Sequence, residues 1–293
     1  MLEIRGATKR FGDRTVLDDV TFGVGAGRLT GFVGGNGAGK TTTMRILLGV
    51  LSADAGEVLV DGRPITADDR RGFGYMPEER GLYPKMRVHE QLVYLARLRG
   101  MRAADASAAA DELIERLELT ERRDEPIEKL SLGNQQRAQI AAALVHDPSV
   151  LVLDEPFSGL DPMAVETVLR VLAERAARGV PVLFSSHQLD LVERLCDDVV
   201  VIADGRIRAA GTRDELRARG AGRQWELQVG DDAGWVRGLH DIAVIDFDGD
   251  YVLFEADPVA AQSVLRLASE RGSVERFAPR RPTLTEIFRE VVQ

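Results

Sequence analysis

The spacing of apolar positions changes along the chain, and each spacing predicts a different kind of element. In residues 1–60, short apolar runs are separated by hairpin turns, which is typical of strands. The predicted strands are Leu2–Lys9, Val16–Val24, Leu29–Val33 and Glu57–Val60. From about Val88 the apolar positions recur at helical spacing, which predicts helices over Arg87–Arg99 and Ala104–Glu118. These two helices begin an inserted helical subdomain at about residues 87–146.

Helices then alternate with strands that are apolar throughout. The predicted order is helix Gln135–Val145, strand Val150–Leu153, helix Met163–Arg178, strand Val182–Ser185, helix Gln188–Leu195 and strand Val199–Ile202. Continuous apolar strands separated by helices are typical of a parallel sheet covered on both faces. We therefore expect residues 1–218 to form an α/β domain with a mainly parallel sheet, preceded by antiparallel strands.

The composition changes beyond a stretch rich in Gly and Arg at residues 218–223, which we interpret as a linker. The elements expected after it are strand Trp225–Val229, helix Ala233–His240, strand Ala243–Phe247, strand Tyr251–Glu255, helix Val259–Ser269 and strand Val274–Phe277. This order resembles the split β-α-β arrangement of ferredoxin-like domains. Thr283 and Glu286 are expected to cap a last short helix. Residues 223–293 should therefore form a small α+β accessory domain.

The overall composition is that of a soluble globular protein and excludes several classes of function. The 293 residues are 44% hydrophobic and 29% charged. The chain contains no run of roughly 18 apolar residues and no signal-peptide pattern at its N-terminus, so we expect it to remain in the cytoplasm. A net charge of −9 argues against a surface that binds nucleic acid, which needs a basic face.

The stretch Gly34–Thr41 carries the clearest chemical signal. It matches G-x-x-x-x-G-K-[ST] at every fixed position, between the apolar run Leu29–Val33 and the helical run Thr42–Leu48. Backbone N–H groups of such a loop surround phosphate oxygens, and the helix N-terminus adds partial positive charge. The strand and helix on either side argue against a flexible turn with a solvated lysine. We predict that the chain binds a nucleoside triphosphate through Gly34, Asn36, Gly37, Ala38, Gly39, Lys40, Thr41 and Thr42.

A second motif narrows the choice among nucleotide-hydrolysing enzymes. The apolar strand Val150–Leu153 ends in two carboxylates, Asp154 and Glu155. Asp154 is expected to hold Mg²⁺ together with the Thr41 hydroxyl, and Glu155 to orient or deprotonate the attacking water. A helix-capping Asp-Glu-Pro turn is the alternative interpretation, and the presence of the phosphate loop disfavours it.

Three further motifs complete the pattern: Leu130–Arg137, Ser158–Asp161 and Ser185–His187. With the two motifs above, and in this order and spacing, they resemble ABC-type ATPases, the nucleotide-binding subunits of ATP-binding-cassette transporters. The resemblance covers residues 1 to about 218. It implies a P-loop NTPase core, ATP and Mg²⁺ as cofactors, and hydrolysis of ATP by two copies, or by one copy and a related cassette, closed head to tail.

The same resemblance implies roles for individual residues. His187 is expected to contact the γ-phosphate and to act with Lys40 and Glu155 in catalysis. Phe11 would contact the adenine ring. The signature residues Ser131, Gly133 and Asn134 would contact the ATP held by the second subunit, and Asp161 would lie in the loop that links the two sites.

The chain departs from the family pattern in two places. The signature motif usually reads Leu-Ser-Gly-Gly-Gln, whereas here Leu132 replaces the first glycine and Asn134 the glutamine. The family normally has glutamine after Pro77, where this chain has Glu78. A carboxylate there can ligate Mg²⁺, can repel the γ-phosphate, or can be a solvated loop residue. We assign Glu78 to the metal site with the other two alternatives open.

These departures resemble one branch of the family, the bacterial type-two export ATPases of sodium-export and daunorubicin-resistance systems. The residues Glu78–Pro84 and the C-terminal Pro-Thr-Leu-Thr-Glu-Ile-Phe stretch carry this finer resemblance. It implies the motor subunit of an exporter, held at the inner face of the membrane by a separate integral membrane permease. A non-transport ABC ATPase, for example one acting in metal-cluster assembly, is the alternative. The transported substrate is not encoded in this chain, because selectivity lies in the permease.

Overall fold

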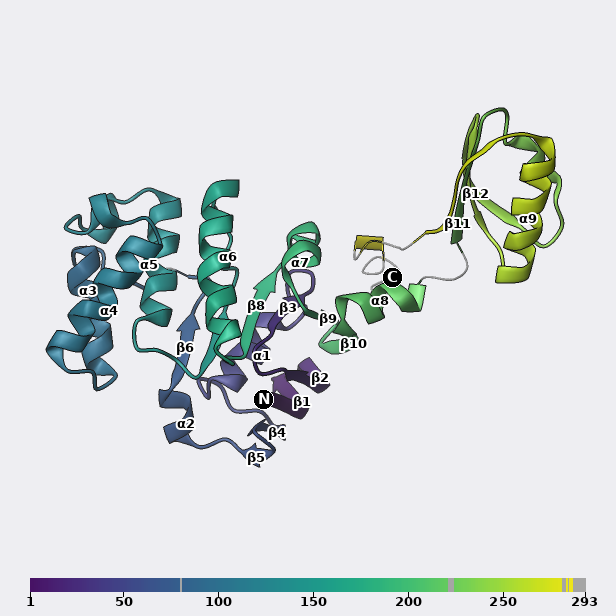
Figure 1. The fold of residues 1–293 in the computed structure, drawn as a ribbon. Coiled ribbons are helices and arrows are strands. Elements are labelled where there is room, and N and C mark those ends of the chain that lie inside the picture. The colour runs from purple at the N-terminus through teal and green to yellow at the C-terminus, as the bar shows by residue number, and fades with distance from the viewer. Residues whose placement is uncertain (80, 221–223, 281–282, 284, 287–293) are drawn as a thin grey trace. The chain divides into compact units, whose positions relative to one another are not determined.

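The computed structural model describes residues 1–293 except 80, 221–223, 281–282, 284 and 287–293. The chain divides into two compact units, Met1–Gly211 and Thr212–Gln293 (Figure 1). The division falls before the linker that the sequence predicts at residues 218–223, and the first of those residues belong to helix α8 (Arg213–Gly220). This helix begins at residue 213 because Thr212 and Glu215 exchange backbone-to-side-chain hydrogen bonds across its first turn.

The first unit begins with an antiparallel sheet whose strand order is β2-β1-β4-β5. Its strands are β1 (Leu2–Phe11), β2 (Arg14–Val24), β4 (Ala55–Val60) and β5 (Arg63–Pro64). Alternate residues of the two long strands are buried, among them Leu2, Ile4 and Phe22, which pack into the main core of the unit. The hairpin between β1 and β2 places Phe11 and Arg14 opposite each other.

A six-stranded sheet of order β10-β9-β3-β8-β7-β6 forms the centre of this unit. Its strands are β3 (Leu29–Val33), β6 (Phe73–Met76), β7 (Val150–Leu153), β8 (Val182–Ser186), β9 (Asp198–Ala203) and β10 (Arg206–Thr212). The pairs β3–β8, β3–β9, β6–β7 and β7–β8 are parallel, which confirms the predicted parallel sheet. The carboxyl ends of β3, β7 and β8 therefore meet at one edge, where ligands of such sheets bind.

Some helices cover the central sheet, and others form the predicted helical subdomain, here called the helical block. The helices of the first unit are α1 (Lys40–Leu47), α2 (Ala67–Arg71), α3 (Val88–Leu98), α4 (Ala103–Arg116), α5 (Leu132–Leu144), α6 (Pro162–Ala177) and α7 (Leu189–Leu195), with short 3₁₀ turns η1 (Thr120–Arg122) and η2 (Ile127–Lys129). In Figure 1, α3, α4 and α5 lie together, and each contacts the other two. Leu92 of α3 and Leu113 of α4 are buried in this block.

The second unit contains a four-stranded antiparallel sheet of order β12-β13-β11-β14. Its elements after α8 are β11 (Gln224–Val229), η3 (Gly234–Gly238), β12 (Ala243–Asp248), β13 (Tyr251–Glu255), α9 (Pro258–Arg271) and β14 (Val274–Pro279). The strand order is that of the predicted split β-α-β arrangement. The predicted helix Ala233–His240 is wrong: this segment forms only the 3₁₀ turn η3. Gly234 and Gly238 each disfavour an α-helix by about 1 kcal/mol relative to alanine.

The chain beyond β14 is described only in part. Thr283 and Glu286 exchange the two hydrogen bonds of the predicted capping box. The rest of the helix predicted after them lies outside the described residues. Within the residues that the structure describes, no helix is both long enough and apolar enough to cross a membrane.

Candidate functional site

The loop between β3 and α1 has a conformation that requires glycine. Gly37 and Gly39 adopt φ values of 77° and 111°, in the left-handed region. A Cβ atom on Gly39 would also lie 2.5 Å from Leu17 Cδ2, so space as well as conformation excludes a side chain. The loop can therefore turn its backbone toward a ligand at the amino end of α1.

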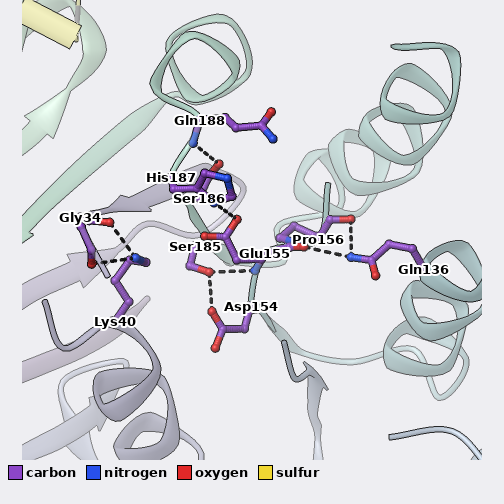
Figure 2. A network of polar contacts seen from close by, with 11 residues as sticks. Gly34, Lys40, Gln136, Asp154, Glu155, Pro156, Ser185, Ser186, His187 and Gln188 are labelled. Atoms are coloured by element: carbon purple, nitrogen blue, oxygen red, sulfur yellow. Dashed lines mark hydrogen bonds and ion pairs between the residues drawn. The ribbon is translucent and has the colours of Figure 1, made fainter. Parts of the chain in front are cut away.

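Lys40 starts α1 and places a buried positive charge beside this loop. Lys40 is only 8% exposed. Its Nζ donates hydrogen bonds to the carbonyl oxygens of Gly34 at 2.7 Å and Gly35 at 3.2 Å (Figure 2). Among the described residues no carboxylate forms an ion pair with Lys40. A buried ammonium without an anionic partner is suited to binding an anionic group such as phosphate.

Asp154 follows β7 and is only 1% exposed. Its Oδ2 accepts a hydrogen bond from Thr41 Oγ1 at 2.9 Å, and its Oδ1 accepts one from Ser185 Oγ at 2.5 Å. The Thr41 hydroxyl and the Asp154 carboxylate are hard oxygen donors that fit Mg²⁺, which takes one or two protein ligands and completes its shell with phosphate and water oxygens.

Glu155 is held by contacts at its backbone and its side chain. Its φ of 52° lies in the left-handed region, which costs a non-glycine residue roughly 1 kcal/mol or more. Its N–H donates to Ser185 Oγ at 2.8 Å, and its carbonyl accepts from Gln136 Nε2 at 2.9 Å. Its carboxylate oxygen Oε2 lies 3.0 Å from His187 Nδ1 (Figure 2). Gln136 of α5 and Ser185 of β8 therefore hold the backbone of Glu155, and His187, just after β8, holds its carboxylate.

One cleft of about 410 Å³ brings most of the predicted site residues together. It is lined by Phe11, Arg14, Val16, Gly35, Asn36, Gly37, Gly39, Lys40, Thr41, Thr42, Glu78, Asp154 and Glu155. Phe11 is 52% exposed, so its ring is available to a planar ligand. Arg14 and Val16 were not predicted and enter the cleft from β2, next to Phe11.

Residues 17–158 match the family model described as ABC transporter. Residues 211–292 match the C-terminal domain of DrrA1-3-like ATP-binding proteins. An uncharacterized ABC transporter ATP-binding protein of Bacillus subtilis strain 168, YhaQ, is 37% identical over 293 residues, which cover 100% of this chain and 98% of that protein. The chain belongs to the ATP-binding proteins of ABC transporters.

Two other comparisons support this membership in the ABC transporter family. Nod factor export ATP-binding protein I of Ralstonia nicotianae is 34% identical, over 98% of this chain and 92% of that protein. A solved ATP-binding subunit of an ABC transporter superposes with a TM-score of 0.70 at 32% identity, over 75% of this chain and 93% of that one. The first unit is thus an ATP-binding cassette.

The residues of the predicted signature motif do not line this cleft. Ser131 caps α5 and accepts a hydrogen bond from the Asn134 N–H at 3.3 Å, and neither these residues nor Gly133 lines the cleft. The Asn134 side chain accepts a hydrogen bond from Arg137 of its own helix at 2.6 Å. Asp161 likewise caps α6, accepting from the Ala164 N–H at 2.9 Å. His187 does not line the cleft either, and its ring contacts the carboxylate of Glu155.

Three polar residues with contacts to the site have no predicted role. Ser185 joins Asp154 to Glu155, as described above. Gln136 and Gln139 are buried on α5, and each donates from one side-chain amide to two backbone carbonyls. In the sequence, two glutamines three residues apart stand among the apolar positions of a predicted helix. This pattern indicates buried amides, which require hydrogen-bond partners.

Proposed function

We propose that this chain is the ATP-hydrolysing subunit of an exporter, which works with a second copy and with a separate membrane permease at the inner face of the membrane. The observation that carries the proposal is the single cleft in which Lys40, Thr41, Asp154 and Glu155 meet. Export is supported by the similarity to the Nod factor export protein and by the DrrA1-3-like C-terminal domain. The permease is inferred from membership in the transporter family.

The residues of the cleft divide the work of hydrolysis. Phe11 stacks on the adenine ring, while Lys40 and the loop N–H groups bind the outer phosphates. Thr41 and Asp154 would hold Mg²⁺, which would neutralise charge that develops on the phosphate oxygens. Glu155 accepts a proton from the attacking water, and the His187 Nδ1–H hydrogen bond keeps its carboxylate in place.

The second copy is needed because the signature residues do not line the chain's own cleft. In the proposed pair, the amino end of α5 with Ser131 and Gly133 faces the γ-phosphate bound by the partner copy, where the helix terminus favours negative charge. Asp161, at the start of α6, lies at the link between the two sites. Two ATP molecules are thus enclosed between two copies.

Replacing Glu155 tests the hydrolytic part of the proposal. Glu155→Gln should lower the steady-state rate of ATP hydrolysis on the order of 10²–10⁴-fold, because an amide cannot accept the proton of water. ATP affinity should be retained, since Lys40 and Thr41 are unchanged, and the variant should accumulate as an ATP-bound dimer on gel filtration. Glu57→Gln, which neutralises an exposed carboxylate of β4 outside the cleft, is the matched control. Hydrolysis by Glu155→Gln at the rate of this control would remove Glu155 from the role of base.

Co-expression with membrane proteins encoded beside the gene tests the transport part. The chain should then sediment with the membrane fraction. Inverted vesicles prepared from these cells should show transport that depends on ATP. If it stays in the supernatant with every neighbouring membrane protein while still hydrolysing ATP, the exporter proposal fails and a non-transport ATPase replaces it.

A further inference from the structure

The side chain of Gln139 binds the chain on both sides of Glu78. Gln139 lies in α5 and is only 4% exposed. Its Nε2 donates hydrogen bonds to the carbonyl oxygen of Pro77 at 2.7 Å and to that of Glu79 at 3.3 Å. The amide nitrogen of Gln139 therefore donates to the carbonyl of the residue before Glu78 and to that of the residue after it.

Glu78 itself lines the ATP cleft. It is exposed, and it shares the cleft with Asp154 and Glu155. An exposed side chain next to two carboxylates and a polyphosphate is repelled toward solvent. Its presence in the cleft thus depends on a backbone that cannot turn away, which is what the Gln139 amide provides.

Glu78 lines the ATP cleft, whereas its neighbour Pro77 lines a second cavity of about 330 Å³. Pro77 and Gln139 line this second cavity, with Tyr75 and His146 among its other residues. On the strand side the loop is fixed where Asp154 N–H donates to the Met76 carbonyl at 2.8 Å. Gln139 lines the second cavity and not the ATP cleft, so it holds the loop from outside the ATP cleft.

We propose that Gln139 is a positioning residue that keeps Glu78 at the ATP cleft and thereby makes nucleotide binding dependent on Mg²⁺. The proposal rests on the ATP site proposed above. A negative charge held there weakens binding of metal-free ATP through repulsion and favours the Mg²⁺ complex through attraction. Both effects raise one quantity, the Kd of ATP in EDTA divided by its Kd in Mg²⁺.

A double-mutant cycle on this ratio tests the proposal in the full-length protein. The cycle consists of wild type, Glu78→Gln, Gln139→Ala and the double variant, titrated with a fluorescent ATP analogue in EDTA and in Mg²⁺. Each single change should lower the ratio on the order of tenfold, the effect of one charge a few Å away in a solvent-accessible cleft. The double variant should equal the singles, because Gln139 acts only through Glu78. Additive effects, or a ratio that neither single change alters, would overturn the proposal.

Two further variants separate this role from a general loosening of the loop. Gln91→Ala removes a buried side chain that accepts a hydrogen bond from the Tyr83 N–H at 2.9 Å, farther along the same loop, and it should leave the ratio unchanged. A ratio lowered equally by Gln91→Ala would contradict the proposal. Gln139→Met keeps the length of the side chain without its donors, so it should reproduce the alanine result if Gln139→Ala does not fold. Failure of the wild type to bind ATP at all would instead refute the proposed ATP site.

Discussion

The hydroxyl of Ser185 joins the two acidic residues of the site, and its removal should be costly. Ser185 is fully buried in β8, donates to Asp154 Oδ1 at 2.5 Å and accepts from Glu155 N–H at 2.8 Å. Ser185→Ala leaves the buried Asp154 carboxylate with one fewer donor and the Glu155 N–H without its acceptor. A lost hydrogen bond to a charged group costs about 1.5–3 kcal/mol and a neutral one about 1 kcal/mol. The expected loss is therefore roughly 2.5–4 kcal/mol of unfolding free energy.

The next residue on the strand supplies the matched control. Ser186 is also buried, but its hydroxyl accepts a single hydrogen bond, from the Gln188 N–H at 3.0 Å. Ser186→Ala should therefore cost only about 1 kcal/mol. Equal costs for the two substitutions would refute the claim that Ser185 stabilises the acidic pair.

Guanidinium unfolding can measure this difference for each unit of the chain. Both tryptophans, Trp225 and Trp235, belong to the second unit, so their fluorescence follows that unit. Circular dichroism at helical wavelengths follows mainly the first unit, which contains α1 to α7. Ser185→Ala should shift the circular dichroism transition to lower guanidinium and leave the fluorescence transition where it is.

The remaining predictions concern the loop lysine and a partly buried histidine. Lys40→Ala should abolish measurable ATP binding in an affinity titration, because the phosphates lose their main side-chain cation; unchanged affinity would show that the loop is not the binding site. Burial lowers the pKa of His146 below its usual 6.5, and its ring donates from Nε2 to the Phe73 carbonyl. The unfolded state thus binds the proton first, so the unfolding free energy of the first unit should be highest above pH 6.5 and fall as pH drops below it. Between pH 7.5 and 5.5 the unfolding free energy should decline less in His146→Gln than in the wild type. Equal declines in the two proteins would exclude the histidine as the cause.

Local signals in the sequence were sufficient to predict most elements and the centre of the site. The apolar runs Leu29–Val33 and Val150–Leu153 are buried parallel strands, as continuous hydrophobicity indicates. Since parallel strands align their carboxyl ends, the segments after β3 and β7 lie at the same edge of the sheet, where Thr41 donates a hydrogen bond to Asp154.

Features that depend on distant partners escaped prediction. Strand β10 carries arginines at alternate positions and lies at the edge of the sheet, so its apolar signal is weak. The segment after Ala233 has apolar residues at helical spacing, yet its glycines leave only a 3₁₀ turn. The roles of Ser185 and Gln139 arise from hydrogen bonds to residues 30 or more positions away, and no local pattern specifies such partners.

The separation of the α5 start from the cleft of the same chain has a consequence for genetics. In the proposed pair, each complete site combines the cleft of one copy with Ser131 and Gly133 of the other. A chain defective at Lys40 still offers an intact α5, and a chain defective at Ser131 still offers an intact cleft. Cells that express both defective alleles together would assemble mixed pairs with one complete site, so the two alleles should complement each other partially, whereas two alleles that both alter the cleft should not.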